Sequence, residues 1–123
     1  MTEVGWLERA VAVLAEAGVP SPRVDAEILA VDGMGLARTA LRRAADPGSG
    51  YWDLVARRAR REPLQHLLGR AWFRHIEVAV GPGVFVPRPE TEVVTGAAVD
   101  EAARQASAGH TPVVVDLGTG TGV

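Results

Sequence analysis

The stretch VVVDLGTGTG, residues 113–122, is the part of the sequence that decides the fold class. It begins with three consecutive valines, a pattern typical of a strand covered on both faces in a parallel sheet. We therefore predict a buried strand over residues 111–117. Gly118, Gly120 and Gly122 follow at alternate positions, which lets the backbone turn tightly and lets a ligand approach main-chain N–H groups. Because open α/β sheets bind ligands at this end of their strands, the stretch predicts a ligand-binding loop.

The spacing of these glycines distinguishes between kinds of ligand loop. A phosphate-binding P-loop is excluded, because no Gly-Lys-Ser/Thr follows. A dinucleotide loop has the pattern G-x-G-x-x-G, whereas the pattern here is G-x-G-x-G. The stretch most closely resembles the nucleoside loop of S-adenosylmethionine-dependent methyltransferases, including the acidic residue at the end of the strand, Asp116. A dinucleotide site and a glycine-rich tail without a ligand stay as alternatives.

A second motif is VPRPETE, residues 86–92. The two prolines flank Arg88 and favour an extended backbone there. The second proline is typical of the first turn of a helix, which we predict to run to about residue 106, and Glu90 and Glu92 complement its dipole. One interpretation is a rigid helix start and nothing more. The other is a stiff corner that holds Arg88, Glu90 and Thr91 at the wall of a neighbouring pocket.

The first seventy residues predict a helical domain. Val4, Leu7, Val11 and Leu14 recur at helical spacing, and Gly18 is typical of a helix end. We predict further helices from Ser21 to the glycines at 33 and 35, over 36–44, over 51–62 and over 63–69. After Gly69 the pattern changes to short β-prone runs, which predict a β-hairpin over about 71–86.

Three segments in this order resemble the HemK/PrmC family, whose members methylate the glutamine of the Gly-Gly-Gln motif in peptide chain release factors. The segments are REPLQHLLGRAWF (61–73), VGPGVFVPRPETE (80–92) and VVVDLGTGTG (113–122). DAEIL (25–29) also matches the helical N-terminal region of the family. The resemblance implies a helical substrate-recognition domain over 1–69, a β-hairpin linker over 70–87 and the beginning of an α/β class I, Rossmann-like methyltransferase domain over 88–123.

The resemblance also implies a cofactor, S-adenosylmethionine, and the residues that bind it. These are the loop itself, an acidic residue that orients the loop and a corner that flanks the pocket, namely Gly118, Thr119, Gly120, Thr121, Gly122, Asp116, Arg88, Pro89, Glu90 and Thr91. The family positions its substrate glutamine with an Asn-Pro-Pro-Tyr motif, and this sequence contains no asparagine. We therefore expect no catalytic residue here and interpret the chain as a truncated N-terminal portion that is inactive alone.

Release factors are the partners that the resemblance implies, with a monomeric, cytoplasmic protein. The net charge of −2 argues against direct nucleic-acid binding, and no apolar run has the ~20 residues of a membrane span. The histidines lack metal-ligand spacing, so we expect no metal. We expect a solvated face for Arg57, Arg58, Arg60 and Arg61, and surface positions for Asp25 and Glu27. The alternatives are a non-catalytic helical module that binds a translation factor and another nucleotide-binding α/β enzyme.

Overall fold

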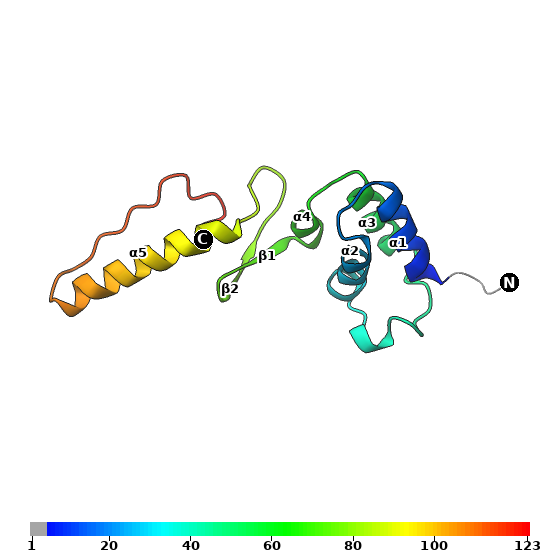
Figure 1. Ribbon diagram of the computed structural model, residues 1–123, viewed down its shortest axis with the longest axis horizontal. Coiled ribbons are helices and arrows are strands. Elements are labelled where there is room, and N and C mark those ends of the chain that lie inside the picture. The colour runs from blue at the N-terminus through cyan, green and yellow to red at the C-terminus, as the bar shows by residue number, and fades with distance from the viewer. Residues whose placement is uncertain (1–4) are drawn as a thin grey trace. The chain divides into compact units, whose positions relative to one another are not determined.

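A computed structural model describes residues 5–123, so Val4 of the first predicted helix lies outside the described residues. The contacts divide the chain into two compact units, one ending at Gly69 and the other running from Arg70 to Val123. The first unit is helical (Figure 1). Its elements in chain order are α1 (Trp6–Glu16), α2 (Pro22–Ile28), the π-helical turn η1 (Leu29–Gly33), the 3-10 turn η2 (Arg38–Ala40), α3 (Ser49–Ala59) and α4 (Leu64–Leu68).

The core of the first unit lies where α1 packs against α2 and α3. Leu14, Leu29, Tyr51 and Val55 are its largest fully buried side chains. The π-helical turn passes close to α3 at Gly33, where an added Cβ would lie 2.9 Å from the Leu54 Cδ1 atom. The apolar periodicity predicted most of the helices correctly, because each buries one stripe against its neighbours. The helix predicted over 36–44 is wrong, since only the 3-10 turn Arg38–Ala40 forms there.

The second unit begins with the predicted hairpin, which is confirmed in part. Strand β1 (Arg70–Phe73) pairs antiparallel with β2 (Ile76–Ala79) through a two-residue turn. The hairpin is shorter than the predicted 71–86, because Gly81, Pro82 and Gly83 end the pairing and residues 84–86 form no strand. Helix α5 (Pro89–Ser107) follows and starts at the predicted proline. The main-chain N–H of Arg74 in the hairpin turn donates to Glu92 Oε1 at 2.6 Å, which joins the hairpin to the first turn of α5.

The predicted strand over residues 111–117 is wrong for the described structure. These residues form no ladder with any other segment between residues 5 and 123. Val113, Val114 and Val115 are exposed, with 85%, 68% and 73% of their surface accessible. A strand exists through the hydrogen bonds that it makes to a neighbouring strand, so a β-prone run without such a neighbour stays irregular. The beginning of an α/β sheet is accordingly absent from the described residues.

A second correction concerns Asp25 and Arg58, which were expected at the surface. Asp25 is only 7% exposed. The Arg58 Nε–H donates to Asp25 Oδ2 at 2.7 Å, and the side chains of the pair are 15% and 11% exposed. The two charges can be buried because they neutralise each other where α2 and α3 meet. Arg60 remains exposed, as the prediction of a solvated face requires, and Arg57 is half-buried and paired with Glu62.

Candidate functional site

The second unit contains a cavity of about 300 Å³ that two separate segments enclose. One segment is the chain that enters α5 together with its first turn, and the other is the glycine-rich stretch (the end marked C beside α5 in Figure 1). The lining residues are Phe85, Val86, Pro87, Arg88, Thr91, Gly118, Thr119, Gly120, Thr121 and Val123. The structure thus brings the two sequence motifs, about thirty residues apart, to one site.

The glycine-rich stretch is shaped by left-handed backbone conformations. Gly118, Gly120 and Gly122 have φ angles of 71°, 55° and 84°, which other residues adopt only with strain. The N–H of Gly122 donates to the carbonyl of Thr119 at 2.9 Å, closing a turn. A Cβ at Gly118 or Gly122 would meet nothing within 4 Å, so the space beside this backbone is free for a ligand.

Asp116 supports this stretch from its N-terminal side. The hydroxyl of Thr119 donates to Asp116 Oδ2 at 2.7 Å. This hydrogen bond holds Asp116 against the loop, although Asp116 itself does not line the cavity. In this structure Asp116 stabilises the conformation of the loop through its hydrogen bond with Thr119.

The corner at Arg88 has the extended backbone that its flanking prolines predict, with φ −97° and ψ 144°. The N–H of Thr91 donates to the Arg88 carbonyl at 3.0 Å and closes the first turn of α5. Arg88 lines the cavity, and its guanidinium has no hydrogen bond or ion pair among residues 5–123. It is therefore available to an anionic group in the cavity.

The predicted site residues divide into those that the cavity exposes and those that lie behind it. Arg88, Thr91 and the loop residues from Gly118 to Thr121 line the cavity, whereas Pro89, Glu90 and Gly122 do not. Sequence reasoning missed Phe85, Val86, Pro87 and Val123, which also line it. Phe85 directly precedes the motif at 86–92, and a large apolar residue at that place is the only feature of the sequence that could have identified it. In the structure its side chain is 89% exposed.

The lining fits part of a nucleoside cofactor. The volume is at the lower end of the ~300–1,000 Å³ of small-molecule sites. Glycines, three threonines, one arginine and apolar residues give the mixture of apolar and few polar groups that such sites have. No carboxylate lines the cavity among the described residues, so an acceptor for ribose hydroxyls is absent from this lining.

Two absences hold for the part of the chain that the structure describes. No group of three or more histidine, aspartate or glutamate side chains within residues 5–123 is placed to hold a metal ion. None of the helices described there is long and apolar enough to cross a membrane.

Comparisons with known proteins identify relatives over most of the chain. Residues 5–69 match the family model of the PrmC N-terminal domain. A release factor glutamine methyltransferase of Streptomyces coelicolor is 57% identical over 111 residues, which cover 89% of this chain and 39% of that protein. Proteins of the same name from Mycolicibacterium smegmatis and Deinococcus radiodurans are 47% and 43% identical over 94% of this chain. The chain spans about two fifths of the length of these curated relatives.

Proposed function

Because this chain belongs to the family of the PrmC N-terminal domain, we propose that it is the N-terminal portion of a release factor glutamine methyltransferase. The proposed reaction moves a methyl group from S-adenosylmethionine to the side-chain amide nitrogen of the glutamine in the Gly-Gly-Gln motif of release factors. The observation that carries the proposal is the cavity in which the glycine loop meets the Arg88 corner. Translation termination takes place in the cytoplasm, so the proposal implies a cytoplasmic protein, which we expect to be a monomer.

The two units have separate tasks in this proposal. Residues 1–69 recognise the release factor, residues 70–87 form the linker and residues 88–123 begin a Rossmann-like catalytic domain. The first unit has a buried core of its own, which supports a recognition domain that keeps its shape. Val113–Val115 are irregular and exposed among the described residues, and we propose that they pair as a strand only beside other strands of a complete methyltransferase domain.

The loop and the corner bind the cofactor from two sides. Gly118 and Gly120 line the cavity with left-handed backbone, and no side chain lies within 4 Å of the position that a Cβ would take on either of them. Asp116 keeps this shape through Thr119. Across the cavity, the Arg88 guanidinium pairs with a carboxylate of the bound molecule. When bound, S-adenosylmethionine supplies a methyl group on a positively charged sulfur.

Methylation of an amide nitrogen depends on positioning, because an amide is a weak nucleophile. The chain contains no asparagine and no Asn-Pro-Pro-Tyr motif to orient the glutamine. We propose that the 123 residues alone hold the cofactor loop in shape without transferring a methyl group.

A chimera tests the proposal. The 123 residues replace the aligned segment of the Streptomyces coelicolor relative, and calorimetry measures binding of S-adenosylmethionine. Transfer of a radioactive methyl group to a release factor measures activity. We expect the chimera to bind and to methylate, and the isolated chain to do neither. Gly120→Val places a branched side chain in the loop and should weaken cofactor binding about tenfold or more, the equivalent of one lost backbone contact.

Gly109→Val is the matched control for this substitution. Gly109 also has a left-handed φ, 83°, and open space around its Cβ position, but it does not line the cavity. It therefore carries the same backbone penalty without touching the loop. Unchanged cofactor affinity in the Gly120→Val chimera would show that the loop assignment is wrong. A chimera that binds the release factor and the cofactor but transfers no methyl group would contradict the proposed reaction.

A further inference from the structure

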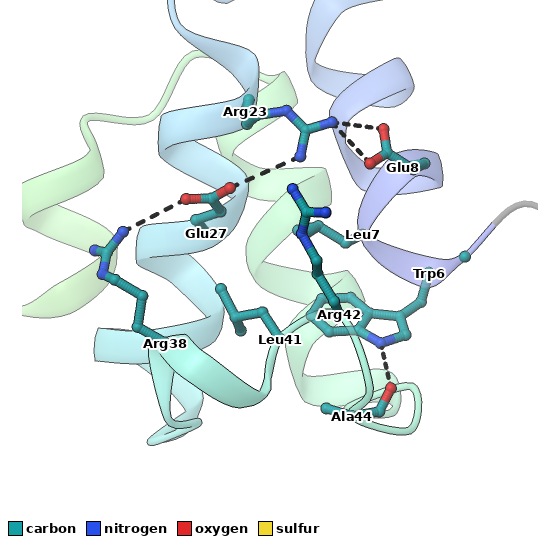
Figure 2. Close-up of a pocket in the computed structure, with 10 residues that line it drawn as sticks. Trp6, Leu7, Glu8, Arg23, Glu27, Arg38, Leu41, Arg42 and Ala44 are labelled. Carbon is teal, nitrogen blue, oxygen red and sulfur yellow. Dashed lines mark hydrogen bonds and ion pairs between the residues drawn. The ribbon is translucent and has the colours of Figure 1, made fainter.

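The first unit has a cavity of its own, of about 520 Å³, at the start of α1 and beside α2 and η2 (Figure 2). Five charged side chains and three large apolar ones surround it. The charged residues are Glu8, Arg23, Glu27, Arg38 and Arg42, and the apolar ones are Trp6, Leu7 and Leu41. The function proposed above gives the helical unit a recognition role as a whole but assigns no contact to these residues. The cavity is large enough for several side chains and much larger than one inorganic ion requires.

The apolar part of this cavity is built into the core. Trp6, Leu7 and Leu41 are 7%, 8% and 5% exposed, so other core residues hold them in place. The Trp6 indole N–H donates to the Ala44 carbonyl at 2.8 Å and is therefore not available to a ligand. Only a small part of each side chain is accessible, and these parts form an apolar floor of fixed shape in the cavity.

Among residues 5–123, the charged side chains that line the cavity carry one positive charge in excess. Arg23 donates to both Glu8 carboxylate oxygens at 2.7 Å and lies 3.7 Å from Glu27. Arg38 lies 3.4 Å from the other oxygen of Glu27. Arg42 has no hydrogen bond or ion pair within residues 5–123, and Figure 2 shows its guanidinium beside the cavity near Leu7. Three arginines thus face two glutamates.

The Glu8 carboxyl is held in its charged form, which the charge balance uses. The hydrogen bond from Arg23 lowers the pKa of the Glu8 carboxyl below its ordinary value, and the positive charges of Arg23 and Arg42 lower it further. Because Arg42 acts on Glu8 through its charge without a hydrogen bond, its guanidinium lies close by and keeps its donors free.

We propose that this cavity binds a peptide segment of a protein partner in which one acidic side chain is next to apolar ones. The carboxylate pairs with Arg42, whose planar guanidinium matches it in a two-point hydrogen bond. The neighbouring apolar side chain covers Trp6 and Leu41. One carboxylate cancels the single positive charge in excess, so peptide and cavity are complementary in charge as well as in shape.

A nucleic acid fits this cavity less well. Its phosphates repeat along the strand, so a second phosphate near the first would meet the carboxylates of Glu8 and Glu27. A peptide with one acidic residue avoids this repulsion. The inference concerns the helical unit alone and holds whether or not the proposed methyl transfer is correct.

A pair of blocked peptides tests the inference on the 123-residue chain. The probes are acetyl-Gly-Leu-Glu-Leu-Gly-amide and the same peptide with Gln in place of Glu, which differ by one charge. NMR titration follows the indole N–H signal of Trp6. We expect a saturable shift at about millimolar concentrations of the Glu peptide and binding of the Gln peptide at least about fivefold weaker, the factor that one exposed ion pair of ~1 kcal/mol gives.

Arg42→Ala and Arg43→Ala form a matched pair of variants. Both remove one positive charge from neighbouring exposed positions, but only Arg42 lines the cavity. Arg42→Ala should abolish the preference for the Glu peptide, and Arg43→Ala should leave it intact. Equal effects of the two variants would overturn the inference, since they would show only a long-range attraction. Equal binding of the two peptides by the unmodified chain would overturn it too, as would a single-stranded DNA hexamer that shifts the Trp6 signal at lower concentration than the Glu peptide.

Discussion

Raising the pH above 10 should destabilise the helical unit through a single side chain, Tyr51. Its ring is fully buried, and its hydroxyl donates to the Ala26 carbonyl at 3.1 Å. The rings of Trp6 and Trp52 meet it edge-on, with centroids 5.2 and 5.6 Å away. Burial, with a smaller contribution from the negative charge of Asp46, raises the pKa of the Tyr51 phenol from 10.0 to about 12.

The direction of the effect follows from this difference in pKa. The unfolded chain loses the phenol proton near pH 10 and the folded chain near pH 12. The stabilisation is therefore complete below pH 10 and is lost as the pH rises to 12. Two pKa units correspond to roughly 2 to 3 kcal/mol, a large part of the stability of a small domain.

Because of the composition of the chain, this measurement reports on one side chain. Tyr51 is the only tyrosine, and the chain has no lysine and no cysteine. No other side chain titrates between pH 9 and 12, because arginine stays protonated there. Absorbance at 295 nm reports the phenolate directly, in buffer for the folded chain and in urea for the unfolded chain. Urea unfolding followed by circular dichroism gives the free energy of unfolding at each pH.

Tyr51→Phe is the control. The variant should lose about 1 kcal/mol at pH 9, because the Ala26 carbonyl loses its donor, and its free energy of unfolding should not change between pH 10 and 12. A phenol that titrates near pH 10 in the folded chain would refute the reasoning. So would a Tyr51→Phe variant whose stability falls with pH as steeply as that of the unmodified chain.

Two further substitutions separate structural from functional residues. Asp25→Ala should lower the free energy of unfolding in urea by about 3 kcal/mol, because it leaves the Arg58 guanidinium buried without its carboxylate. The double variant Asp25→Ala/Arg58→Ala should lose little more than the single variant. A double variant whose loss equals the sum of the two single losses would contradict this coupling. Arg88→Ala in the chimera should lower methyl transfer at least about tenfold while the melting temperature stays within about 1 °C, since Arg88 has no partner among residues 5–123. A lower melting temperature with normal activity would instead show that Arg88 stabilises the start of α5 and has no role in the cavity.

The helices could be predicted closely because their signals are local. Pro22 and Pro89 begin α2 and α5, as a fixed φ and a missing N–H favour at a helix start. Part of the candidate site could be predicted for the same reason, since glycine alone allows the left-handed backbone at Gly118 and Gly120 without strain. The expected strand over residues 111–117 failed because its signal is not local: valines favour a strand but do not provide the neighbour that pairs with it.

The sequence by itself determined the helical stripes, the hairpin near position 70 and the conformation of the glycine loop, because each depends on the sterics of a few adjacent residues. Only the tertiary structure decided which charges are buried. Asp25 and Arg58 resemble surface residues until α2 and α3 pack and place them 2.7 Å apart. It also decided that the Arg88 corner and the glycine loop share a cavity. In the cavity of the helical unit, Arg23 and Arg38 are paired with glutamates, whereas the Arg42 side chain has no partner among residues 5–123. Such facts depend on contacts between residues far apart in the chain, whose geometry no local pattern encodes.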